Sequence, residues 1–214
     1  IVAGLMSFDP RYDNATPYGR ATPNRKGFNV LFDYEDTDAR WNVGLDAELL
    51  TDVVGQGTTT LKNYNTGSVF GELRLNKIFN WENRKFWISG RYGMQDTKRS
   101  GEQSYEQVDL ATRFQDYNFT ATIFGDLELI AQYRLWQSKG DEQVAERNEY
   151  SEIIDYAEYS IDYKESIVGA GLQYGFTEKT NLSFLYQTFA WEDSKELTLP
   201  YNINTWTLFF TMKF

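Results

Sequence analysis

The charged residues that could act together recur at every second position of several segments. Alternate residues of an extended chain project from the same face, so the members of each segment share one side. The basic members are Arg40, Arg74, Arg91, Arg113 and Arg134. The acidic members are Asp33, Asp46, Glu48, Glu72 and Glu128, and Glu35, Asp109 and Lys213 occupy equivalent positions.

Acids and bases are therefore nearly balanced on this predicted face. An isolated charge in a poorly hydrated interior is costly, so balance is what a closed network of ion pairs needs. The same charges around a water-filled channel would set a transverse field that selects solutes. Both interpretations, a plugged interior and a pore, stay open at this point.

Catalysis has little support in the composition. The chain has no histidine and no cysteine, which excludes a Ser-His-Asp device, a His-ligated metal and a thiolate site. Asp46 and Glu48 share a face and could form an acid–base pair, but such pairs are common in any acidic protein. We expect no enzyme activity, no cofactor and no metal.

The segment 138–160 is unusually acidic, and Gly140–Glu165 carries a carboxylate at every third residue from Glu146 to Glu158. Tyr and Ile also recur there at helix-like spacing. It could be an extracellular helix, a folded-in constriction loop or strand extending beyond a membrane, and a solvated acidic loop is the favoured interpretation. No EF-hand spacing is present. The basic loop 9–26 could contact anionic lipopolysaccharide or a partner.

Composition narrows the class of protein. The 214 residues carry a formal charge of −10, which argues against general nucleic-acid binding. No apolar run approaches the ~18 residues of a spanning helix. Ile1–Phe8 has no basic start and no long apolar stretch, so we expect a mature or truncated chain.

Alternating apolar residues define the elements that would position the charges. Such alternation predicts strands with one apolar and one polar face. The segments are Phe28–Tyr34, Trp41–Leu49, Val69–Leu75, Phe86–Met94, Leu127–Leu135, Val168–Phe176, Leu182–Tyr186 and Trp206–Phe214. Counting from Ile1 predicts about ten antiparallel strands in a single domain, 1–214, many of a length that crosses a bilayer at a tilt.

The connections alternate in length. Short turns are expected at 36–39, 80–84, near 115–118 and at 177–180, although a turn at Gly125-Asp126 competes with the third. Longer connections are expected at 9–26, 51–66, 97–103, 138–160 and 192–202. All four prolines fall in the longer set, as expected because proline is expelled from strand interiors. Short turns and termini would then share one side.

The chain ends WTLFFTMKF, with a terminal Phe preceded by alternating apolar residues. This resembles the C-terminal strand of bacterial outer-membrane β-barrels of the porin-like kind. The resemblance implies an all-β, antiparallel transmembrane barrel in the cell outer membrane, with short periplasmic turns and long extracellular loops. It also implies an insertion signal read by the barrel-assembly machinery at Trp206, Leu208, Phe210, Met212 and Phe214.

Three functions remain to be distinguished. The first is a porin-like barrel that gives small polar solutes passive passage through a charged lumen, as a complete barrel or, because Ile1 opens in an apolar stretch, as the C-terminal part of a larger one. The second is a non-conducting structural or adhesion barrel that binds a partner through its loops. The third is a soluble ligand-binding β-barrel, in which the charged face would look outward into water.

Overall fold

The computed structural model describes residues 25–54, 60–81, 84–101, 103, 106–150, 152–177, 180–195 and 199–212. These residues form one antiparallel sheet of nine strands and a single helical turn. The strands are β1 (Arg25–Glu35), β2 (Trp41–Asp52), β3 (Asn63–Arg74), β4 (Phe86–Arg99), β5 (Val108–Phe124), β6 (Leu127–Arg147), β7 (Ile153–Thr177), β8 (Thr180–Asp193) and β9 (Tyr201–Met212), with α1 at Leu75–Ile78.

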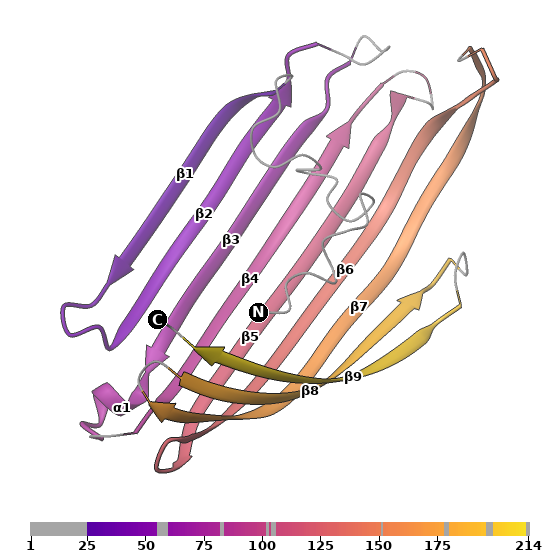
Figure 1. Ribbon diagram of the computed structural model, residues 1–214. Coiled ribbons are helices and arrows are strands. Elements are labelled where there is room, and N and C mark those ends of the chain that lie inside the picture. Colours follow the sequence, from indigo (N-terminus) through magenta and orange to yellow (C-terminus); the bar gives the residue numbers. More distant parts are fainter. Residues whose placement is uncertain are drawn as a thin grey trace.

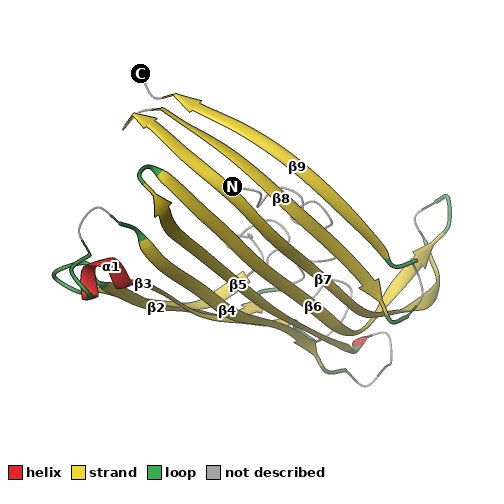
Figure 2. Ribbon diagram, turned by 90° about the horizontal axis from the view of Figure 1, so that it is seen from below, coloured by secondary structure: helices red, strands yellow, loops and turns green. Residues whose placement is uncertain are grey.

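Each strand pairs with the next in sequence, so the order in the sheet is β1 to β9 without a crossover (Figure 1). The sheet curls across its width, and β8 and β9 come round in front of β3 to β6 (Figures 1 and 2). Within the described residues β1 and β9 are not paired with each other, so the sheet is not closed. The expectation of an all-β antiparallel fold is confirmed. The tenth strand, expected from Ile1, lies outside the described residues.

Two expected boundaries were wrong. Residues 115–118 are not a turn: β5 runs straight through them, and the chain turns at Gly125, where φ is +53°. Glycine adopts this conformation without steric cost, which favours the hairpin there. The polar residues that suggested the earlier turn, Asp116 and Asn118, instead hydrogen-bond to each other on a strand face.

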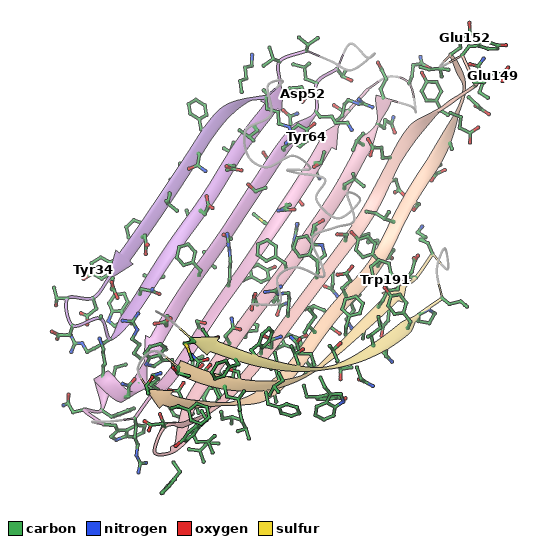
Figure 3. The ribbon with its side chains drawn as sticks, viewed as in Figure 1. Tyr34, Asp52, Tyr64, Glu149, Glu152 and Trp191 are labelled. Carbon is green, nitrogen blue, oxygen red and sulfur yellow. The ribbon has the colours of Figure 1, made fainter. Side chains whose placement is uncertain are left out.

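The acidic segment 138–160 is neither a helix nor mostly loop. Strand β6 continues to Arg147, β7 begins at Ile153, and the two stay paired up to that point. The segment is therefore confirmed as strand, and the favoured interpretation, a solvated acidic loop, was wrong. The β6–β7 hairpin extends beyond the neighbouring strands. Strand β5 pairs with β6 only as far as Glu142, and β8 pairs with β7 only as far as Tyr163. Its tip carries Glu149 and Glu152 (Figure 3).

The two faces of the sheet differ in composition. Directly paired residues of neighbouring strands share a face, so the register assigns each side chain to one side. One face, which we call the convex face, carries an exposed apolar band that follows all nine strands. The apolar band consists of Phe28–Tyr34, Trp41–Leu49, Gly67–Leu73, Phe86–Met94, Tyr117–Ile123, Leu127–Leu135, Val168–Phe176, Leu182–Tyr186 and Trp206–Met212, taken at alternate positions.

Large side chains of this band are well exposed. Phe28 is 77% accessible, Leu208 67% and Trp206 65%. A monomeric soluble protein rarely leaves so continuous an apolar surface in water. Tyr34 and Trp41 lie together at the short-turn end, their ring centroids 5.2 Å apart.

Beyond the apolar band the pattern inverts. Past Leu135 and Val168, in the direction of the longer connections, the convex face carries four cross-strand ion pairs, which we call the charged collar. These pairs are Arg113–Asp96 at 2.7 Å, Lys98–Asp109 at 3.4 Å, Lys139–Asp162 at 3.2 Å and Lys164–Glu192 at 3.9 Å. The apolar residues of the same strand segments turn to the opposite, concave face.

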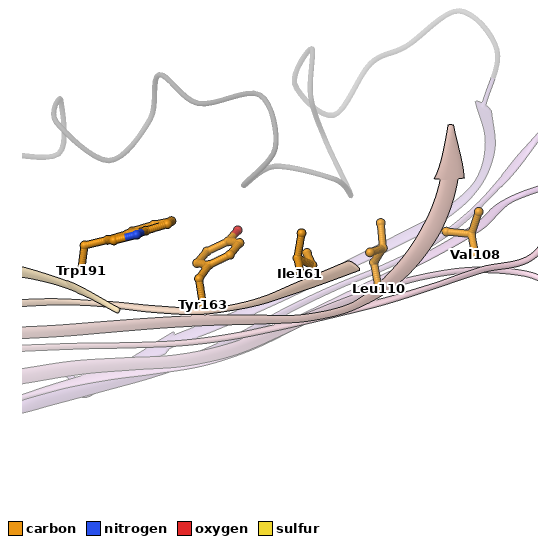
Figure 4. Packing of buried hydrophobic residues seen from close by; sticks show 5 residues of the cluster. All are labelled: Val108, Leu110, Ile161, Tyr163 and Trp191. Atoms are coloured by element: carbon orange, nitrogen blue, oxygen red, sulfur yellow. The ribbon is translucent and has the colours of Figure 1, made fainter. Parts of the chain in front are cut away.

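Those inward apolar residues form the buried cluster of the sheet. Val108, Leu110, Ile161, Tyr163 and Trp191 are each at most 6% exposed and lie on one side of β5, β7 and β8 (Figure 4). The Tyr163 and Trp191 rings stack with centroids 4.8 Å apart. A single strand such as β7 is therefore apolar outward at Leu172 and apolar inward at Ile161.

Candidate functional site: the charged concave face

The concave face gathers most of the charges that the sequence singled out. Eight of the ten expected residues project from it, at paired positions along β1 to β6. They are Asp33, Asp46, Glu48, Glu72, Arg74, Arg91, Glu128 and Arg134. Local alternation is enough to place them, because the neighbouring positions on each strand are occupied by residues of the apolar band.

An acidic wall covers the concave side of the first two strands. It consists of Asp33 and Glu35 on β1 and of Asp46 and Glu48 on β2. The Asn29 amide donates to Glu48 at 3.1 Å and to Asp46 at 3.4 Å. Asp46 and Glu48 are only 8% and 6% exposed. The neutral amide of Asn29 therefore contributes hydrogen bonds to both of these closely spaced carboxylates.

Arg91 on β4 faces the acidic wall. Its guanidinium donates to the Ser68 hydroxyl at 2.9 Å and 3.2 Å, while the nearest Asp46 oxygen is 3.9 Å away. The same group lies 5.7 Å from the Phe114 ring centroid and 5.9 Å from that of Phe70. Arg91, Asp46 and Glu48 line a small cavity of about 170 Å³. The arginine and the wall therefore border the same polar space.

Further along the sheet the arginines form closer pairs. Arg134 on β6 donates to Asp116 on β5 at 2.5 Å and 3.0 Å. Arg74 on β3 contacts Glu72 at 2.5 Å and reaches Glu35 on β1 at 3.3 Å. Charge-assisted contacts of this length fix the orientation of the side chains. These pairs hold the charges of β3 to β6 in place.

A larger cavity opens at the short-turn end, beside α1. Its volume is about 970 Å³, and Lys77, Arg84 and Lys85 line it opposite Asp126 and Glu128. Lys85 and Glu128 approach to 2.5 Å. This cavity is therefore lined by both basic and acidic side chains.

The opposite end of the concave face is crossed by one ion pair. Lys62, just before β3, contacts Glu142 on β6 at 2.5 Å, although β4 and β5 lie between these strands in the sheet. Asp52 and Tyr64 lie at the same end, on β2 and β3 (Figure 3). This contact therefore crosses the width of β4 and β5 on the concave side of the sheet.

Three residues expected on this face lie elsewhere. Arg113 lies on the convex face, opposite Met94, and binds Asp96 there. Asp109 is also convex and binds Lys98. Both were misplaced because apolar residues were assumed to face outward along the whole of β5, whereas the pattern inverts in this part of the strand.

Arg40 lies in the turn between β1 and β2. Its guanidinium donates to Asp36 at 2.6 Å and also lies 3.4 Å from Asp38. This hydrogen bond lowers the pKa of Asp36, because it stabilises the charged carboxylate. Arg40 thus stabilises a turn and is not part of the concave face. Lys213 lies outside the described residues.

Several charged residues of the concave face were not found from the sequence. They are Arg25, Asp52, Arg99, Asp116, Glu142, Glu165 and Asp193. Asp116 was hidden by the wrongly placed turn, and most of the others lie above the apolar band. The alternation of Tyr117, Phe119 and Ala121, had it been recognised as a strand, would have placed Asp116 on the polar face.

Metal binding has no support in the described part of the chain, where no group of three or more potential ligands could hold an ion. No helix among these residues has the length and apolarity to cross a bilayer. Comparison with known proteins gave no matching family model, no matching curated protein and no matching solved structure.

Proposed function

We propose that this chain forms the wall of a bacterial outer-membrane β-barrel whose concave face lines a passage for small polar solutes. The observation that carries the proposal is the apolar band, which is bounded along the strands by the charged collar. The outward positions of one continuous sheet change from apolar to charged along β4 to β8. Such a change is expected where the two parts of one surface contact two different environments.

The height of the apolar band fits a bilayer. On β6 it extends from Leu127 to Leu135, a rise of roughly 26 Å at ~3.3 Å per residue. Strands of such barrels tilt by about 40°, which reduces the vertical height to roughly 20 Å. Outer-membrane barrels have an outward apolar band about 25 Å tall. A soluble barrel gives no reason for a band of this height on its outside.

Within the described residues β1 and β9 each have a neighbouring strand on one side only, which supports closure through further strands. An unpaired N–H or C=O group in hydrocarbon costs several kcal/mol, so sheets that cross membranes close into barrels. Bacterial single-chain barrels have an even number of strands. Nine strands are described, so we infer at least one further strand, which pairs with β1 and helps to close the sheet onto β9.

The passage itself is supported by the polarity of the concave face. Its residues level with the apolar band are largely charged, amide or hydroxyl side chains, and cavities of about 170 and 970 Å³ border them. About eight strands enclose a space that side chains fill, whereas larger barrels leave a channel. Conduction therefore depends on how many strands complete the wall.

The last strand is consistent with the proposed assembly signal. Trp206, Leu208, Phe210 and Met212 lie on the convex face, paired with β8, and Phe214 lies outside the described residues. We propose that these alternate positions are read by the barrel-assembly machinery, and that the charged collar contacts the lipopolysaccharide headgroups.

A second candidate is a non-conducting adhesion barrel. It is favoured by the projecting β6–β7 hairpin, whose tip exposes Tyr150 (75%) and Ile154 (63%) beyond the neighbouring strands. Exposed apolar side chains on a projecting element are typical of contact surfaces. Under this alternative, removing 143–158 would abolish partner capture, and no conductance would be measured.

Planar-bilayer recording tests the first proposal directly. The full chain, refolded in detergent, should insert and give discrete conductance steps in 1 M KCl. A protein that folds and inserts without conducting would contradict the passage and favour the adhesion barrel. A protein that remains monodisperse without detergent would contradict the membrane barrel altogether and favour the soluble ligand-binding alternative.

A further inference from the structure

We infer that the connection between β3 and β4 binds the surface of an anionic phospholipid bilayer, an inference that rests on the proposed function. The connection contains α1 and projects from the short-turn end of the sheet (Figure 1). Its residues Ile78, Phe79 and Trp81 are 40%, 57% and 47% exposed. No apolar residue larger than alanine occurs in the other short connections, which are 36–40, Gly125–Asp126 and 178–179. This connection therefore differs from them in presenting large apolar side chains at the end of the sheet.

The aromatic rings of this connection continue the apolar band beyond the strands. Phe79 and Trp81 stack with their ring centroids 5.2 Å apart. The Trp81 ring meets Phe86 edge-on at 6.2 Å, and Phe86 meets Phe119 in the same way at 5.2 Å. Phe86 and Phe119 belong to the convex apolar band, on β4 and β5. If the band contacts hydrocarbon, the rings of the connection lie where the hydrocarbon ends, at the headgroup level that tryptophan favours.

The backbone of the connection holds these rings in a defined place. The Trp81 N–H donates to the Asn76 carbonyl oxygen at 2.8 Å. Asn80 has φ +52°, a left-handed conformation that asparagine adopts more readily than most residues. The Asn76 side chain accepts a hydrogen bond at 3.0 Å from the Trp87 indole, on β4. Trp81 also borders the cavity at the short-turn end, so its indole lies at the rim between that cavity and the convex face.

Two basic side chains of the connection supply the charge that a phosphate headgroup attracts. Lys77 and Arg84 are exposed, and neither forms an ion pair with any described residue. The Lys77 ammonium donates to a neutral group, the Asp38 carbonyl oxygen, at 3.3 Å. Apolar rings beside Lys and Arg residues are the combination by which protein segments bind the interface of a bilayer that contains anionic lipid. A neutral bilayer would use the rings alone, whereas an anionic one uses the rings and the charges.

The experiment measures the quenching of Trp81 fluorescence by brominated lipid. The full chain is refolded into vesicles of phosphatidylethanolamine and phosphatidylglycerol, in which part of the lipid carries bromine on the upper acyl chain. Subtracting the spectrum of Trp81→Phe, which keeps an aromatic ring at this position, isolates the Trp81 signal. That signal should fall by roughly half, because an indole at the headgroup level lies close to the upper acyl chain.

The charge is tested in the same assay. Replacing phosphatidylglycerol by phosphatidylcholine should reduce the quenching of Trp81, because the attraction of the two basic residues to the surface is lost. The double variant Lys77→Gln/Arg84→Gln should remove this dependence on phosphatidylglycerol. The matched control is Lys139→Gln/Lys164→Gln, which removes the same charge from the charged collar and should leave the quenching of Trp81 unchanged.

Two further tryptophans separate the failure of this inference from the failure of the proposed function. Trp206→Phe isolates the signal of a residue in the apolar band, which lipid should quench, and Trp136→Phe that of a concave residue, which lipid should not quench. Quenching of Trp206 without quenching of Trp81 would overturn the inference and leave the membrane barrel standing. Absence of quenching at both would refute the membrane barrel itself. Equal quenching of Trp81 with and without phosphatidylglycerol would overturn the anionic surface as the partner.

Discussion

Leu172 on β7 offers the sharpest test of the proposal that the apolar band faces lipid. It lies in the middle of that band, directly between Leu129 on β6 and Phe184 on β8, and is 43% exposed. If this position faces hydrocarbon, Leu172→Arg places a charge near the bilayer midplane. Such substitutions in membrane barrels lower the free energy of unfolding by about 2–4 kcal/mol.

The control is Gln137→Arg, on the same face of β6 but one position above the apolar band. A charge near the interface costs only about 0–1 kcal/mol. The assay is equilibrium unfolding in guanidinium of protein refolded into phospholipid vesicles. If the band instead faced water, an exposed leucine replaced by arginine would change stability by less than about 0.5 kcal/mol. Equal, small effects of the two substitutions would refute the assignment of the band to lipid.

Three further predictions concern the backbone and the turns. Gly140 has φ +146° and a Cβ there would lie only 1.9 Å from the Asp109 carbonyl oxygen, so Gly140→Ala should lower the unfolding free energy by at least ~1 kcal/mol, or prevent refolding, in the same assay. Ala39 has φ +51°, so Ala39→Gly should raise it by roughly 0.5–1 kcal/mol, and a loss would contradict the turn geometry. Because the Arg40 hydrogen bond lowers the pKa of Asp36, the turn gains stability above the ordinary aspartate pKa of 3.8. That gain should be lost as pH falls through the lower folded value, and Asp36→Asn should remove this acid dependence in an unfolding series from pH 6 to 2.

The sequence by itself determined the strand class and most of the two-sided pattern. Alternation with a period of two has a direct physical cause, since successive side chains point to opposite faces. It correctly assigned residues such as Asp33, Glu48 and Arg134 to the polar side. The turn at 36–39 and the hairpin at 177–180 were also correct, and Pro200 lies between β8 and β9 as expected.

Only the tertiary structure decided where the pattern inverts. Alternation tells which residues share a face, but it does not tell what that face contacts at each height along the strand. Strand parity is unbroken between Tyr117 and Val108 and places Arg113 outward and Val108 inward. The assumption that apolar residues face outward at every height gave both residues the opposite role. The continuous β6–β7 hairpin likewise depends on cross-strand pairing, which overrides the helix-like spacing of its Ile and Tyr residues.

The charge of the concave face also depends on this inversion. The sequence placed acids and bases in near balance because it counted Arg40 and Arg113 among the inward residues. Pairing moved one to a turn and the other to the convex face, and it brought Asp116 in. Among the described residues, the set of charges that share this face is known only after nine strands are aligned, because it depends on long-range register that no single segment contains.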